Sequence, residues 1–123
     1  MELDRVTGLI IGAGIEVHRR LGPGLLESAY QECLAYELGE RGVAFERERP
    51  LPVVYKGVGL DCGYRLDFLV DGAVVVEVKA VEALAPIHSA QVLTYLKLGG
   101  WELGLLLNFN VKVLRDGIRR VRI

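Results

Sequence analysis

The sequence predicts an α/β protein in which helices flank a mixed β-sheet. Two observations favour this class. Apolar residues recur at helical steps near the N-terminus and again after Pro86, while short β-rich runs separated by turn residues fill the remainder. The resulting order of elements, ααββββαββ, predicts a mixed sheet with helices packed on it. With 123 residues, 51% of them hydrophobic and 25% charged, we expect one domain over residues 1–123.

Two helices open the chain. Residues 3–21 carry apolar side chains at three- and four-residue steps, which form one face of a helix. The run Leu21-Gly22-Pro23-Gly24 breaks this helix, and a second periodic segment extends from about Leu26 to Arg41. We therefore expect two helices joined by a tight loop.

Four β-rich runs follow, at residues 43–47, 51–55, 64–70 and 73–79. Pro50 and Pro52 mark the second run as an edge strand or an irregular one. Asp71-Gly72 indicates a hairpin turn between the last two runs. These runs predict the first part of the sheet.

Pro86 opens a third helix that extends to about Leu98. Residues 102–109 are then typical of a buried strand, and residues 118–123 of an edge strand. Asp116-Gly117 is the expected turn between residues 111–115 and this last strand.

Composition limits the location and the partners. No apolar stretch approaches the roughly 18 residues of a membrane span, and the first residues lack the basic start and apolar core of a signal peptide. We expect a cytoplasmic protein with no membrane partner. Cys33 and Cys62 show no spacing typical of zinc or iron–sulfur ligands.

The net charge of −1 argues against an extended basic surface for nucleic acid. The charge is nevertheless uneven, because Arg115, Arg119, Arg120 and Arg122 crowd the C-terminal end. A solvated edge strand accounts for these arginines as well as a phosphate-binding patch does.

Three charged residues, Asp67, Glu77 and Lys79, lie inside two runs that otherwise look buried. A buried carboxylate or ammonium group costs free energy unless it is paired or binds a metal. Glu77 and Lys79 are two residues apart on a strand and therefore share one face. Taken alone, the trio fits either an ion pair on an exposed sheet face or a metal site.

The loop of the hairpin distinguishes these alternatives, because directly opposed residues share a face. A two-residue loop pairs Val70 with Ala73 and puts Asp67 on the wrong face from Glu77. A three-residue loop pairs Val70 with Val74 and places Asp67 across from Glu77. A metal site therefore requires an odd loop or a bulge. Two facing carboxylates then repel unless a cation, such as a hard divalent metal, lies between them.

These residues resemble those of a known family. Asp67 followed by Glu77-Val78-Lys79 resembles the Asp…(Asp/Glu)-x-Lys signature of the PD-(D/E)XK nuclease superfamily. Gly24-Leu25-Leu26-Glu27-Ser28-Ala29-Tyr30 resembles the motif that names the GxxExxY family of small bacterial proteins within it. The run from His88 to Leu96 is similar to the Gln-x-x-x-Tyr motif of exonuclease domains in bacterial recombination enzymes. The resemblance extends from about Val17 to Arg120, with Leu66 in place of the proline of the superfamily's name.

The resemblance implies a restriction-endonuclease-like core and a nuclease that uses Mg²⁺ (or Mn²⁺) to hydrolyse phosphodiesters, with DNA as the expected substrate. It implies that Asp67 and Glu77 hold the metal and that the carbonyl of Val78 adds a ligand. Lys79 would orient or deprotonate the attacking water. Glu27 would be a further metal ligand or would support one. Glu27 is also a favourable acid in the first turn of a helix, without any other role.

Four more residues are candidates for binding the substrate. Gln91 and Tyr95 are four apart on the third helix, with His88 one turn earlier, so the three share a face. This face lines the cleft or is the solvent side of the helix. His18 either complements the dipole at the end of the first helix or contacts a phosphate.

Two functions remain. The first is a metal-dependent nuclease that acts on DNA. The second is a catalytically silent module with a nuclease fold that binds nucleic acid or a protein partner, which the near-neutral charge favours. The complete set of Asp67, Glu77 and Lys79 favours the nuclease. The weak basic character leaves room for a homodimer, a partner protein or a small positive patch that holds the DNA.

Overall fold

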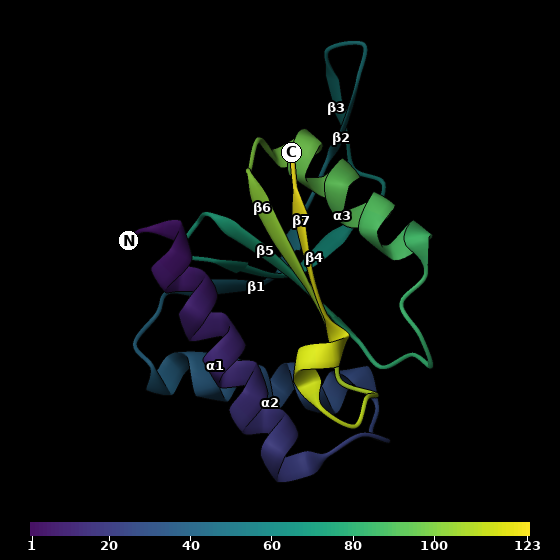
Figure 1. Ribbon diagram of the computed structural model, residues 1–123. Coiled ribbons are helices and arrows are strands. Elements are labelled where there is room, and N and C mark those ends of the chain that lie inside the picture. The colour runs from purple at the N-terminus through teal and green to yellow at the C-terminus, as the bar shows by residue number, and fades with distance from the viewer.

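The structure is a computed structural model that describes residues 1–123. Two helices come first, five strands follow, and a helix precedes the last two strands (Figure 1). The helices and strands are α1 (Leu3–Leu21), α2 (Glu27–Glu40), β1 (Phe45–Pro50), β2 (Val53–Tyr55), β3 (Val58–Leu60), β4 (Arg65–Val70), β5 (Val74–Lys79), α3 (Pro86–Gly99), β6 (Leu103–Asn108) and β7 (Ile118–Arg122).

Five of the strands form one mixed sheet in the order β1-β4-β5-β6-β7. Strands β5 and β6 run parallel, and the other neighbours are antiparallel. The parallel pair requires a crossover, which α3 supplies. The expected α/β class, with a mixed sheet flanked by helices, is confirmed.

The structure has one more strand than we expected. The run at residues 51–55 was expected to be one strand, but Val53–Tyr55 pairs only with Val58–Leu60, in a separate two-stranded hairpin. Lys56 and Gly57 have φ values of 50° and 79°, which suits the tight turns that join two strands directly. This β2–β3 hairpin projects beyond the sheet at the top of Figure 1.

A second difference concerns the turn expected at Asp116-Gly117, which begins two residues earlier in the structure. The structure has a 3₁₀ turn, η1 (Leu114–Gly117), immediately before β7. Burial explains this difference, because the turn inserts the Leu114 side chain into the core between α1 and β6. Leu114 is accordingly only 2% exposed.

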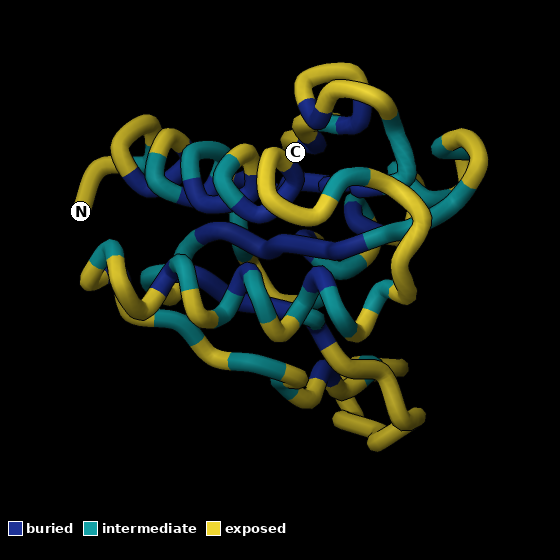
Figure 2. Tube along the Cα trace, turned by 90° about the horizontal axis from the view of Figure 1, so that it is seen from below, coloured by how far each residue is buried: buried dark blue, intermediate teal, exposed yellow.

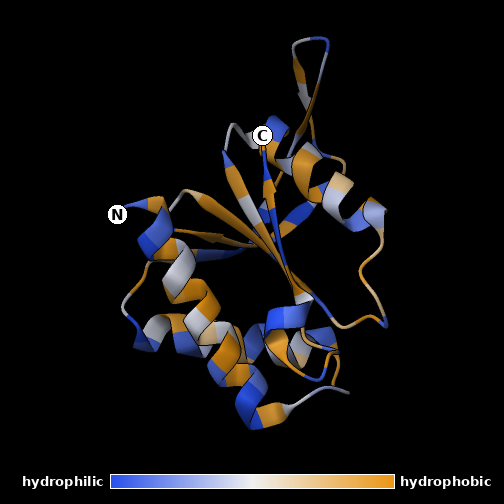
Figure 3. Cartoon of the chain, in the orientation of Figure 1, coloured by the Kyte–Doolittle hydropathy of each residue, from blue (hydrophilic) through white to orange (hydrophobic).

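The two faces of the sheet carry separate cores. Helices α1 and α2 cover one face, where Ile10 and Leu34 join Val76 and Leu105. Helix α3 covers the other face, where Val92 and Leu96 pack on Val75 and Leu106. The buried residues gather in the interior in Figure 2, and the central strands are the most hydrophobic part of the chain in Figure 3.

Gly104 sets how closely α3 approaches the sheet. A Cβ atom on Gly104 would lie 2.5 Å from Cγ1 of Val92, which is closer than two carbons can approach. Any side chain there would therefore push α3 away from β6.

The length and apolar character that a membrane-crossing helix needs are not found together in any helix of this structure.

Candidate active site

Strands β4 and β5 are joined by a three-residue loop, Asp71-Gly72-Ala73. Asp71 and Gly72 have φ values of 54° and 63°, a left-handed conformation that glycine and aspartate tolerate. The loop pairs Val70 with Val74 and Phe68 with Val76. Of the two loop lengths that the sequence allows, this is the one that places Asp67 opposite Glu77.

The backbone pairing of β4 with β5 ends at Phe68 and Val76, and beyond this point side chains connect the strands. Glu77 Oε2 accepts a hydrogen bond from the Asp67 N–H at 2.8 Å. Asp67 Oδ2 accepts one from the Val78 N–H, also at 2.8 Å. The two carboxylates therefore lie side by side between the ends of the strands, each held by the opposite backbone.

Asp67, Glu77 and Lys79 share the sheet face that α3 covers. Val75 lies in the core beneath α3, and strand alternation puts Glu77 and Lys79 on the same side. Glu77 is only 7% exposed. None of the seven ion pairs of the protein includes Asp67, Glu77 or Lys79. The buried carboxylate of Glu77 and the half-buried carboxylate of Asp67 thus face each other without an ion-pair partner.

The protonation of this pair reflects its burial. Burial, followed by the charge of Asp67, raises the pKa of Glu77 to about 8. Burial also raises the pKa of Asp67, against the opposing effects of its hydrogen bond from Val78 and of the Lys79 charge. Without a cation, the site therefore retains a proton at neutral pH. A bound cation would displace that proton.

Glu27 reaches the same end of β5 from α2. Its Oε2 accepts a hydrogen bond from the Ala80 N–H at 3.2 Å, and its charge contributes to raising the pKa of both Asp67 and Glu77. The first residue of α2 therefore points toward the carboxylate pair and away from bulk solvent.

Tyr30 fixes the loop from which α2 begins. Its hydroxyl donates to the Gly22 carbonyl at 2.7 Å and accepts from the Leu25 N–H at 3.1 Å. The fully buried ring stacks on Phe109 at a centroid distance of 4.6 Å. Phe109 in turn donates its backbone N–H to the Lys79 carbonyl at 2.9 Å. The spacing of Gly24, Glu27 and Tyr30 thus gives a helix start whose orientation is set against the end of β5.

The three candidates on α3 differ in burial and in hydrogen bonding. Tyr95 is half-buried, and burial followed by the Glu77 charge raises its pKa, so its hydroxyl stays protonated close to the carboxylates. Gln91 lies one turn earlier and is exposed. His88 Nδ1 accepts the Ala85 N–H at 2.9 Å, which caps the start of α3. Only Nε2 of His88 remains for a substrate.

His18 lies apart from the α3 group, in the last turn of α1. It is buried, and its Nε2 donates to the Val111 carbonyl at 2.7 Å. The ring therefore anchors the segment that follows β6. It also borders a cavity of about 440 Å³ whose other lining residues include Arg19, Lys112 and Arg115.

Two residues at the site escaped the sequence analysis. Asn108, at the end of β6, is buried and bonds both the N–H and the C=O of Val81, which ties the chain after Lys79 to the sheet. Glu48 lies opposite Asp67 in the register of β1 and β4, and its charge also raises the pKa of Asp67. Asn108 was visible in the sequence only as a lone asparagine at a strand end. No sequence pattern indicated the role of Glu48, because its position opposite Asp67 depends on the register of β1.

The donor chemistry fits a magnesium ion only in part. No three His, Cys, Asp or Glu side chains are arranged so that together they could hold a metal. Asp67 and Glu77 are nevertheless a pair of oxygen donors beside the backbone of Val78. Magnesium keeps several waters and binds proteins through one or two carboxylates. A pair of carboxylates is therefore sufficient for this ion, with Glu27 as a further acid whose charge acts on both members of the pair.

Comparison with known proteins identifies the family. The family model described as "PD-(D/E)XK nuclease superfamily" matches residues 4–121, nearly the entire chain. The chain belongs to this superfamily. A search of curated proteins gave no match, and neither did a search of solved structures. The match covers the superfamily, and the narrower GxxExxY assignment stays a prediction from the sequence.

Proposed function

We propose that this member of the superfamily is a metal-dependent nuclease that hydrolyses phosphodiester bonds in DNA. The observation that carries the proposal is the pair Asp67 and Glu77, a half-buried and a buried carboxylate that face each other with no ion-pair partner and with Lys79 on the same face. A sheet face without a ligand would gain stability from apolar residues at these positions. Retaining both acids is understandable if they bind a cation.

Asp67, Glu77 and the Val78 carbonyl would hold Mg²⁺ or Mn²⁺. The bound ion would supply charge neutralisation at the phosphate and a more acidic water. Glu27, which bonds the Ala80 N–H at the end of β5, would accept a hydrogen bond from that water or would be a further ligand of the ion. Removal of the proton that Glu77 carries near neutral pH would accompany metal binding.

Lys79 is proposed as the residue that orients or deprotonates the attacking water. It lies two residues beyond Glu77 on the same strand face and has no ion-pair partner among the acids of the protein. Its ammonium group is therefore available to the water or to the phosphate. The Lys79 carbonyl is fixed by Phe109, so the strand end that carries this side chain is rigid.

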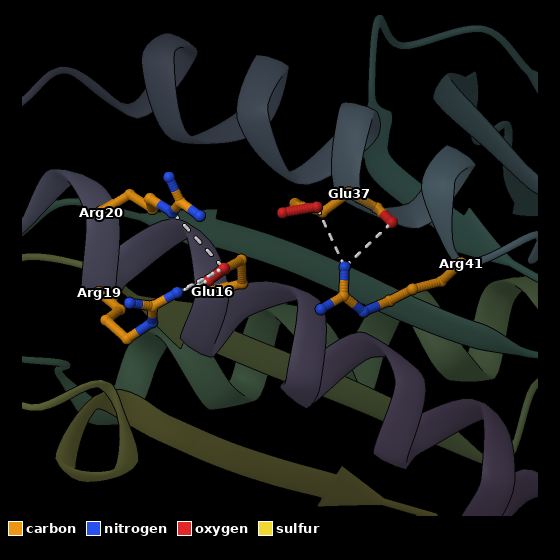
Figure 4. A network of polar contacts seen from close by, with 5 residues as sticks. All are labelled: Glu16, Arg19, Arg20, Glu37 and Arg41. Atoms are coloured by element: carbon orange, nitrogen blue, oxygen red, sulfur yellow. Dashed lines mark hydrogen bonds and ion pairs between the residues drawn. The ribbon is translucent and has the colours of Figure 1, made fainter.

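The distribution of charge supports a nucleic acid as the substrate despite the net charge of −1. Every ion pair of the protein lies within residues 1–71, and the pairs of α1 and α2 are drawn in Figure 4. The basic residues that follow have no acidic partner. They are Lys79, Lys97, Lys112, Arg115, Arg119, Arg120 and Arg122.

Five of these free cations lie in one segment, residues 112–122, which we call the basic segment. This segment begins next to Phe109, whose N–H bonds the Lys79 carbonyl, so it starts at the edge of the candidate site. Unpaired cations that lead away from a cleavage site are suited to the phosphates of a polynucleotide. We propose that the basic segment binds the DNA backbone, with His18 supporting it through Val111.

Gln91 and Tyr95 are proposed to contact the substrate beside the carboxylates, and His88 to contribute through its free Nε2.

The deciding experiment is cleavage of labelled single-stranded and double-stranded DNA with Mg²⁺, Mn²⁺ or a chelator. Glu77→Gln serves as the control, since it keeps the shape of the side chain. Cleavage by the wild type alone, abolished by chelator, is expected. Binding of DNA without cleavage under all these conditions would instead identify a catalytically silent module.

A further inference from the structure

Helix α3 has a second stripe of residues that does not face the sheet. Val92 and Leu96 pack on the sheet, whereas the other stripe borders a cavity of about 400 Å³. The cavity is closed on its other side by Val53 of β2 and by Tyr64, and we call it the tyrosine cavity. The residues that α3 contributes are Ile87, Ala90, Gln91, Thr94, Tyr95 and Leu98.

The lining of the tyrosine cavity carries no charge. The rings of Tyr64 and Tyr95 lie 6.1 Å apart at an angle of 56°, and Tyr64 is 48% exposed. The amide of Gln91 and the hydroxyl of Thr94 are the polar groups that α3 adds beside these rings. A phosphate would find no cation here. A nucleobase has apolar faces that stack on tyrosine and polar edges that pair with an amide or a hydroxyl.

Tyr95 connects this cavity to the carboxylate pair. It lines the cavity, and it packs on the core cluster beneath α3 that includes Leu66, the chain neighbour of Asp67. The charges of Glu77 and Asp67 also contribute to its raised pKa. A ligand in the cavity would therefore lie beside the phosphodiester bond that water would attack at the site. The hairpin that carries Val53 extends past α3 in Figure 1, and in Figure 3 it has hydrophobic strand residues and a hydrophilic tip.

The bases of a duplex are stacked inside the double helix and do not reach a cavity walled by a hairpin and a helix unless they are unstacked, which costs a few kcal/mol. Unpaired bases are free to enter. We propose that the tyrosine cavity binds an unpaired nucleobase beside the scissile phosphate, so that the enzyme cuts single-stranded DNA or single-stranded ends in preference to the interior of a duplex. This inference rests on the proposed nuclease function.

The test uses DNA oligonucleotides that contain one 2-aminopurine, whose fluorescence is quenched when the base stacks on an aromatic ring. Binding is measured with Ca²⁺ in place of Mg²⁺, and cleavage is measured with Mg²⁺ on single strands and on blunt duplexes of the same sequence. The variants are Tyr64→Ala, which removes one ring, and Ala90→Leu, which fills the cavity from an exposed helix position. Tyr36→Ala is the matched control, because Tyr36 is an exposed tyrosine on α2.

We expect both cavity variants to weaken binding of the single strand by roughly 5- to 150-fold, the effect of losing one stacked base, and to lose the quenching. Cleavage of single strands should fall with binding, while Tyr36→Ala behaves as the wild type. Thermal melting checks that each variant is folded. Equal effects of Tyr64→Ala and Tyr36→Ala, or unchanged quenching in Ala90→Leu, would overturn the inference.

Two further outcomes are distinguishable. If the wild type cleaves no DNA in Mg²⁺ or Mn²⁺, the proposed function fails, and the fluorescence alone still decides whether the cavity binds a base. If sedimentation shows a dimer that Ala90→Leu dissociates, the cavity is a contact between two copies of the chain, and the base-binding assignment is wrong.

Discussion

The Glu77 carboxylate accepts a hydrogen bond from the Asp67 N–H, and the Asp67 carboxylate accepts one from the Val78 N–H. The two acids therefore bridge β4 and β5 where the backbone pairing of these strands ends. Each carboxylate thus has a structural role in addition to the proposed metal-binding role. Variants that separate the two roles are the most informative.

Glu77→Ala removes the acceptor of the buried Asp67 N–H, whereas Glu77→Gln keeps a carbonyl oxygen in its place. At pH 5 we expect Glu77→Ala to lower the free energy of unfolding by about 1–3 kcal/mol and Glu77→Gln to lower it by less. Both should abolish cleavage. Urea unfolding measures the first effect. Equal losses of stability in the two variants would show that the hydrogen bond contributes little.

The raised pKa of Glu77 makes the stability of the metal-free protein depend on pH. The unfolded chain binds this proton only below about 4.5, its ordinary pKa, whereas the folded chain binds it up to about 8. Folding is therefore favoured by proton uptake between these values, and stability should fall as the pH rises from 5 to 8.5. Thermal melting in chelator measures this fall. It should be smaller in Glu77→Gln, and Mg²⁺ should stabilise the wild type more at pH 8.5 than at pH 5.

Lys79→Met should retain the fold and metal binding but lose cleavage by on the order of 10²–10⁴-fold, the usual contribution of a positioned proton-transfer group. Single-turnover cleavage in saturating Mg²⁺ measures this loss. A rate close to that of the wild type would mean that Lys79 only balances the charge of the two carboxylates.

Tyr30→Phe removes one hydroxyl that both donates to Gly22 and accepts from Leu25. Because both partners then lack a bond in a partly buried loop, we expect a loss of about 1–2 kcal/mol in the free energy of unfolding. Affinity for Mg²⁺ should also decrease, since this loop positions Glu27. Tyr36→Phe, at an exposed site on the same helix, is the control. An unchanged Mg²⁺ affinity would show that Glu27 does not take part in metal binding.

Neutralising the basic segment should weaken DNA binding in a salt-dependent way. Lys112→Gln and Arg115→Gln should each make the slope of log K, the association constant for DNA, against log salt concentration shallower by roughly 0.7–0.9. This is the value for one lost phosphate contact. Arg5→Gln is the control, because Arg5 is exposed and also unpaired but lies in the first turns of α1. The same change in slope for all three variants would show that no localised phosphate site exists.

The sequence predicted the three helices and the strands that carry Asp67 and Glu77, because their periodicity and turn residues are local signals. The register of the β4–β5 hairpin was left open between two loop lengths, since both are compatible with Asp71-Gly72. The β2–β3 hairpin was missed because Lys56-Gly57 is a weak turn signal and Gly59 interrupts the β-rich pattern. Local patterns also gave no indication that Glu48 lies opposite Asp67, or that Val53 and Tyr64 close a cavity against α3, because these contacts join distant segments.

The most direct test of the metal site is a crystal structure of the protein with Mn²⁺, with data collected for the anomalous signal of manganese. We expect one ion bound between a carboxylate oxygen of Asp67 and one of Glu77, with the Val78 carbonyl as a further ligand at about 2.0–2.4 Å. The same crystals of Asp67→Asn should show much weaker density. An empty position between Asp67 and Glu77, at Mn²⁺ concentrations that support cleavage of DNA in solution, would contradict the assignment of these two residues as metal ligands.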